Sequence, residues 1–162
     1  MRNTLKLALA AVALTASAAF ADNLQDGARY FQRADYQRAL VSWRPLAVQG
    51  NPVAQNNLGG LYRDGKGVPR DYGKASQWFS ASASQGNSAG MYNLGLMYEM
   101  GQGMKSEPFH AYMWYALAAD QGNMPNAAAH RDALWRRMTP AAQQEARRLA
   151  VACKSNSYRG CR

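Results

Sequence analysis

Residues 63–71 read RDGKGVPRD, where two glycines flank Lys66 and charged residues lie on either side. Glycines let backbone N–H groups approach an anion and lysine adds positive charge, so the stretch has the composition of a phosphate-binding loop. A P-loop, however, reads G-x-x-x-x-G-K-[ST] and joins a strand to a helix. Here valine follows Gly67, and the related stretch GQGMKSE (101–107) has no lysine between its glycines. We therefore predict that Gly65 and Gly67 provide positive φ angles and that Lys66 is solvated.

The stretch GNSAG at residues 86–90 fits the G-x-S-x-G nucleophile elbow. That elbow needs a strand before the serine, whereas the preceding WFSASASQ reads as a helix. His110 and His130 are too few and too widely separated for a convincing metal site. Six methionines lie from Met91 to Met124, which favours adaptable core packing or a partner surface over a Cu(I) site. We expect no catalytic residue, no cofactor and no metal.

These stretches belong to a repeat of 36 residues. The tripeptide QGN recurs at 49–51, 85–87 and 121–123, and Asn-Leu-Gly at 57–59 returns at 93–95. Further matches at the same spacing are Ala39, Ala75 and Ala111; Tyr62 and Tyr98; Gly65 and Gly101; Gly67 and Gly103; and Trp78 and Trp114. Such self-similarity indicates a repeat architecture.

Each repeat reads as two helices. The first covers about 52–63, and the G-x-G loop ends it. Asp71 is a good N-cap for a second helix over 72–85, which Gly86 ends. In the next copy Pro108 opens the second helix at a position where proline is tolerated. Shorter or altered pairs stand at the two ends, as capping units do, and the last helix is expected over about 140–153.

The chain begins with MRNTLKLALAAVALTASAAFA, residues 1–21. A basic start, a short apolar run and a small-x-small site are typical of a cleaved secretory signal peptide. The apolar run is shorter than the roughly 20 residues that a membrane span needs. We therefore expect a periplasmic protein, or a secreted one, without stable membrane insertion.

The two cysteines, Cys153 and Cys161, lie close together in sequence. In an oxidising compartment such a local pair indicates a structural disulfide, and the spacing is not the C-x-x-C of a redox-active pair. Charge also gathers at this end: residues 131–162 carry eight basic and two acidic side chains. A solvated helix face is one interpretation; an acidic protein, lipid or envelope-polymer partner is the other. Nucleic acid is not expected for an exported chain without a binding motif.

The repeats follow A-x-x-x-L-G-x-x-Y-x-x-G-x-G-V-x-x-D-x-x-x-A-x-x-W-x-x-x-A-x-x-G. This pattern resembles the Sel1-like repeat family, which is related to tetratricopeptide repeats. Residues 54–86 match nearly every position and residues 90–122 match well. The resemblance implies an all-α, right-handed α-solenoid that binds other proteins. We divide it into an N-terminal capping pair (22–50), two repeats (51–86 and 87–122) and C-terminal capping helices with a disulfide-closed tail (123–162).

By analogy with tetratricopeptide grooves, the first helices should line a concave face that binds a partner protein. The side chains expected on it are Asn56, Asn57, Arg63, Tyr92, Asn93, Glu99, Met100, Trp135 and Arg136. The asparagines would bond a partner's backbone, and Tyr92 and Trp135 would anchor apolar groups.

The resemblance leaves three functions open, and we expect that the protein is not an enzyme. One is a regulator or assembly factor of envelope machinery. Another is an immunity protein that neutralises a secreted toxic effector such as a lipase. A third is penicillin binding or hydrolysis, known for members with a cysteine pair in each repeat; the repeats here contain no cysteine.

Overall fold

The computed structural model describes residues 23–121 and 124–161, and the regular elements in these ranges are α-helices. A first helix covers residues 23–32. The others are α2 (Tyr36–Val48), α3 (Pro52–Asp64), α4 (Tyr72–Ala83), α5 (Ser88–Met100), α6 (Pro108–Asp120), α7 (Pro125–Arg137) and α8 (Pro140–Ser155). The predicted signal peptide, residues 1–21, lies outside the described residues. None of the described helices is long and apolar enough to span a membrane.

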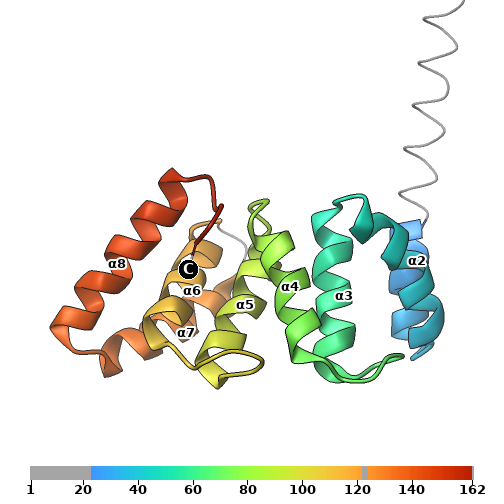
Figure 1. Ribbon diagram of the computed structural model, residues 1–162, viewed down its shortest axis with the longest axis horizontal. Coiled ribbons are helices and arrows are strands. Elements are labelled where there is room, and N and C mark those ends of the chain that lie inside the picture. Colours follow the sequence, from blue (N-terminus) through green and yellow to red (C-terminus); the bar gives the residue numbers. More distant parts are fainter. Residues whose placement is uncertain (1–22, 122–123, 162) are drawn as a thin grey trace, which may run out of the picture.

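The helices form consecutive pairs that follow one another along the long axis, from α2 at one end to α8 at the other (Figure 1). Each helix packs on the next one in sequence from α2 to α7. In addition, the first helices α3 and α5 contact each other, and α8 packs on α6. The predicted all-α solenoid of helix pairs is confirmed.

Side chains at the helix starts explain where the helices begin. Asp71 accepts a hydrogen bond from the backbone N–H of Lys74 at 2.9 Å, so the predicted N-cap is confirmed. Asn51 and Asn87 cap α3 and α5 in the same way, each through the QGN tripeptide. These bonds satisfy N–H groups that have no partner inside the helix.

The G-x-G loops turn the chain from the first helix of a repeat into the second. Gly65 and Gly67 have φ angles of 68° and 71°, and Gly101 and Gly103 have 65° and 73°, as predicted. The second glycine of each loop is also needed for space: a Cβ on Gly67 would lie 2.8 Å from the carbonyl carbon of Tyr36. Each loop is thereby seated on the first residue of the preceding second helix, Tyr36 for one loop and Tyr72 for the next.

The buried residues reveal a shift that the sequence pattern hides. Ala54, Gly90 and Ala127 are buried at equivalent places on α3, α5 and α7, and so are Leu61, Met97 and Leu134. Their spacing is 36 residues from α3 to α5 but 37 from α5 to α7. Because α7 begins at Pro125, the third first helix starts one residue later than the QGN tripeptide suggests.

Candidate functional site

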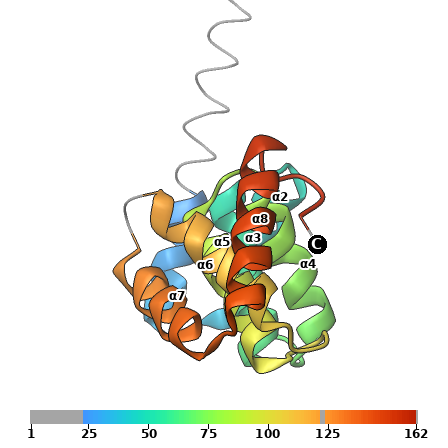
Figure 2. The same ribbon diagram turned by 90° about the vertical axis from the view of Figure 1, so that its left-hand side faces the viewer.

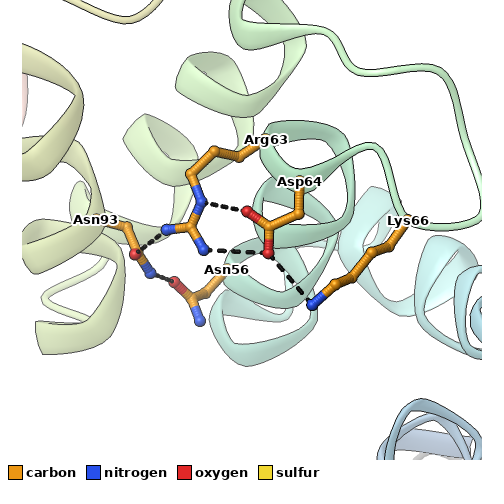
Figure 3. A network of polar contacts seen from close by, with 5 residues as sticks. All are labelled: Asn56, Arg63, Asp64, Lys66 and Asn93. Atoms are coloured by element: carbon orange, nitrogen blue, oxygen red, sulfur yellow. Dashed lines mark hydrogen bonds and ion pairs between the residues drawn. The ribbon is translucent and has the colours of Figure 1, made fainter. Parts of the chain in front are cut away.

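A network of polar side chains links α3, α5 and the first glycine loop (Figure 3). Arg63 donates from Nη1 to Asn93 Oδ1 at 2.8 Å and from Nε to Asp64 Oδ1 at 2.7 Å. Asn93 Nδ2 in turn donates to Asn56 Oδ1 at 2.8 Å. Lys66 Nζ lies 3.6 Å from Asp64 Oδ2. The network therefore ties two neighbouring repeats together and carries two cations for one carboxylate.

The carboxylate of Asp64 is held in its charged form by this arrangement. Partial burial raises its pKa, but the hydrogen bond and charge of Arg63, with the charge of Lys66, outweigh it, so the pKa is lowered. Arg63 is itself held on the other side by the ring of Phe79, whose centroid is 5.8 Å from Cζ.

The sequence predicts that Lys66 is solvated, but in the structure its side chain contacts two aromatic rings. Its ammonium lies 5.2 Å from the ring centroid of Phe31 and 5.5 Å from that of Tyr36, and its side chain is 38% exposed. A cation over aromatic faces is attracted by the ring quadrupole. The prediction was wrong because both rings belong to the preceding helix pair, which the loop sequence does not reveal.

Beside this network lies a hollow of about 320 Å³ between the first helix pair and α3. Its lining is Ala28, Phe31, Gln32, Trp43, Asn56, Asn57, Gly60, Arg63, Asp64 and Asn93. Gly60 forms an open part of the floor, because a Cβ there would meet nothing within 4 Å. Within the described ranges, the amides of Gln32 and Asn57 have no hydrogen-bond partner. The hollow thus offers free amides next to a guanidinium.

A second hollow, of about 490 Å³, shares Arg63 and Asp64 with the first. Its remaining lining residues are Arg70, Tyr72, Leu96, Met100 and Gln102. Met100 is 59% exposed. The two hollows share Arg63 and Asp64, and the surface that they line is termed the α3–α5 face.

A different cluster stands where α5 meets α6 and α7. Tyr115 donates its hydroxyl hydrogen to Glu99 Oε2 at 2.7 Å, and His130 Nδ1 lies 3.2 Å from the same oxygen. Tyr92 packs against both rings, with centroids 5.7 Å away in each case. Burial of Tyr115, followed by its bond to Glu99, raises the pKa of the phenol. The Tyr115 hydroxyl and the Glu99 carboxylate satisfy each other here, while the hydroxyl of Tyr92 has no hydrogen-bond partner among the described residues.

The structure separates the predicted site residues instead of gathering them in one groove. Asn56, Asn57, Arg63 and Asn93 meet at the first hollow, and Met100 lines the second. Tyr92 and Glu99 belong to the aromatic cluster. Arg136 is exposed on α7. Trp135 lies instead between Tyr112 of α6, at 5.2 Å, and Arg147 of α8, whose Cζ is 4.3 Å from the ring centroid.

Sequence reasoning missed several residues of these sites. Asp64 and Lys66 lie beside the predicted Arg63 and had been assigned to the loop alone. Gly60 and Gln32 belong to no recognisable sequence motif, so no signal in the sequence pointed to them. His130 was missed because the one-residue shift makes it the equivalent of Asn93; the proline at 125 was the available signal.

The motifs with catalytic resemblance have other places in the fold. Ser88 is the first residue of α5 and follows helix α4, so no strand precedes it. Among the described residues, no group of three or more histidine, cysteine, aspartate or glutamate side chains could hold a metal ion. Met91, Met97 and Met113 are buried in the core.

The predicted disulfide joins Cys153 and Cys161, with a Cα–Cα distance of 5.2 Å. It folds the tail back so that the hydroxyl of Tyr158 accepts a hydrogen bond from Gln121 at 2.9 Å. The tail is thereby fixed to the end of α6. A structural disulfide of this kind indicates an oxidising compartment.

Stacked helix pairs, G-x-G loops and a polar face on the first helices define a helical repeat protein. Residues 52–87 and 88–123 each match the Sel1 repeat. The chain is therefore a Sel1 repeat protein. No curated protein matches the sequence significantly.

Solved structures with a similar fold include two bacterial proteins. One is a protective antigen present in uropathogenic Escherichia coli strains that displays an SLR fold, with a TM-score of 0.77 and 26% identity over 86% of this chain. The other is a Sel1 repeat protein from Oxalobacter formigenes, with a TM-score of 0.63 and 34% identity over 67% of this chain. The matches span 31% and 44% of those longer chains.

Proposed function

We propose that this protein is a periplasmic interaction module, a regulator or assembly factor of envelope machinery, that captures a partner protein on the α3–α5 face and catalyses no reaction. Sel1 repeats commonly mediate protein interactions, and the disulfide suits an oxidising compartment. The two solved relatives are longer proteins, so the assignment of a role rests on this chain's own surface.

The observation that carries the proposal is the unfilled hollow beside Arg63. Free amides at Gln32 and Asn57 can donate to and accept from a partner's backbone, and Arg63 offers charge already oriented by Asp64 and Asn93. The equivalent of Gly60 in the next repeat is Leu96. The missing side chain leaves room for a residue of the partner.

Gly60→Leu tests this role with a side chain taken from the next repeat. The leucine meets open space, and glycine is unfavourable inside a helix, so we expect a gain of up to about 1 kcal/mol in the free energy of unfolding. Partner binding should nevertheless be lost, because the leucine fills the hollow. Urea denaturation measures the gain in stability. The loss of binding is measured with the partner that site-specific photo-crosslinking identifies.

A photo-crosslinking amino acid placed at Gly60, in the full chain produced in its own host, should form adducts that mass spectrometry can identify. The matched control places it at Val41, an exposed residue of α2 that lines neither hollow of this face. Equal adducts at both positions, or undiminished binding of the identified partner by Gly60→Leu, would refute the α3–α5 assignment. The partner's identity then separates an envelope regulator from an immunity protein.

A further inference from the structure

A separate hollow lies at the end of the molecule opposite α2, where the start of α6 meets the α7–α8 turn (Figure 2 views the molecule from this end). It measures about 300 Å³ and is lined by Pro108, Phe109, Leu134, Arg137, Met138, Thr139 and Ala142. The walls are mainly apolar, and Arg137 is the charged residue among them. None of these residues takes part in the α3–α5 face.

The basic residues of the C-terminal helices, which include Arg137 of this hollow, are only partly neutralised. Of the two carboxylates in residues 131–161, Asp132 pairs with Arg131 at 2.8 Å and Glu145 with Arg148 at 2.6 Å. Lys154 pairs with Asp120 of α6 at 2.9 Å.

Four arginines then form no ion pair with a carboxylate among the described residues: Arg136, Arg137, Arg147 and Arg159. The pKa of Asp132 is lowered mainly by its hydrogen bond with Arg131, and the charge of Arg136 also contributes. Arg136 and Arg137 end α7, and Arg147 lies over Trp135, the residue that precedes them. Glu107, the N-cap residue just before α6, lies 2.6 Å from His110. The rim beside the hollow therefore carries uncompensated positive charge.

The shape of the apolar surface distinguishes an anionic membrane from an acidic protein segment as the partner. A membrane surface is bound by apolar side chains that protrude into it. Here the apolar residues are recessed: Leu134 is 5% exposed, and Phe109 and Met138 are half-buried. The large apolar side chains that do protrude in the described part, such as Val151, do not line this hollow. A recess beside arginines suits a side chain that enters from outside.

We propose that this hollow is a second docking site, which takes one large apolar side chain from an acidic segment of a partner protein. The apolar side chain fills the space between Phe109, Leu134 and Met138. Flanking carboxylates of the segment pair with Arg137 and Arg136. The site lies on the capping helices, so it is independent of the α3–α5 face and of the function proposed for it.

Fluorescence anisotropy of a labelled peptide, GDEEFEDEG, against the full folded chain tests the proposal. Two matched probes replace its phenylalanine by glycine or its acidic residues by asparagine and glutamine. We expect both to bind at least about fivefold more weakly, and the acidic peptide to bind less tightly as salt rises from about 0.05 M to about 0.3 M. Equal binding of all three peptides would overturn the proposal.

Variants of the protein locate the binding. Arg136→Glu with Arg137→Glu should weaken the acidic peptide at least about fivefold, and Ala142→Phe should do so without a charge change by filling the recess. Arg159→Glu, at an unpaired arginine of the tail, is the matched control and should change little. Circular dichroism verifies that each variant folds. An undiminished affinity in the double variant contradicts the site, as does binding to phosphatidylglycerol vesicles without binding to the peptide.

Discussion

At two junctions between repeats, side chains in equivalent positions come together with opposite chemistry. At the α3–α5 junction Arg63 lies over Phe79 and donates to Asn93; at the α5–α7 junction Glu99 accepts from Tyr115 and lies beside His130. Arg63 and Glu99 occupy equivalent positions, and so do Phe79 and Tyr115.

The comparison shows that the repeat fixes which positions come into contact, while the side chains at these positions can differ. The backbone brings one side chain of each first helix to the next first helix and to the following aromatic ring. At the second junction the Tyr115 hydroxyl and the Glu99 carboxylate bond each other within an aromatic cluster. At the first it leaves a cationic network beside unpaired amides. This difference supports the proposal that the partner binds at the first junction, beside the hollow.

The largest expected effect tests the shared geometry. A Cβ on Gly59 would lie 2.6 Å from the ring of Phe79, and one on Gly95 would lie 2.8 Å from that of Tyr115. Gly59→Val and Gly95→Val should each lower the free energy of unfolding by about 2–3 kcal/mol, because both overpack the contact. Urea denaturation measures the two losses. A harmless valine at either position would show that the junctions are not built alike.

The next effect tests the chemistry of the second junction. Tyr115→Phe removes the hydroxyl that Glu99 accepts from, and should lower the free energy of unfolding by about 1–2 kcal/mol. Tyr92→Phe, at a tyrosine whose hydroxyl has no hydrogen-bond partner in the described part, is the control and should cost less than about 0.5 kcal/mol.

The same phenol gives that junction a dependence on alkaline pH. The pKa of Tyr115 is raised in the folded state, so its contribution is complete below the unfolded pKa of about 10 and is lost as pH rises above it. Stability of the wild type should accordingly fall more steeply above about pH 10 than that of Tyr115→Phe. Parallel pH profiles would argue against the buried phenol–carboxylate bond.

The smallest effect concerns the carboxylate of the first junction. The pKa of Asp64 is lowered on folding, so its contribution is present above the unfolded value of about 3.9 and is lost as pH falls through the folded pKa. Asp64→Asn should cost about 0.5–1 kcal/mol at neutral pH, a modest amount because the pair is partly solvated. Its stability should also fall less than that of the wild type on acidification below about pH 4. Thermal melts at several pH values detect both changes.

The period of the repeat, the G-x-G loops and the Asp71 cap could be predicted because each depends on residues close together in sequence. The position of Lys66 could not, because its aromatic partners come from another helix pair. The alignment of α7 was missed for a subtler reason. The QGN tripeptide keeps a spacing of 36, while the buried residues change to 37, so the most visible match concealed the change that places His130 beside Glu99.

The seating of Gly67 on Tyr36 and of Gly103 on Tyr72 is a contact between backbones. This contact involves only backbone atoms and Cβ of the tyrosines, so one repeat can pack on the next when the residues on its surface change. Duplicating residues 72–107 in the gene would supply a new unit with its own seat for the next one. The number of repeats and the binding specificity can therefore evolve separately. Repeats are added through the contacts of Gly67 and Gly103, while binding changes with residues at positions such as 60 and 63.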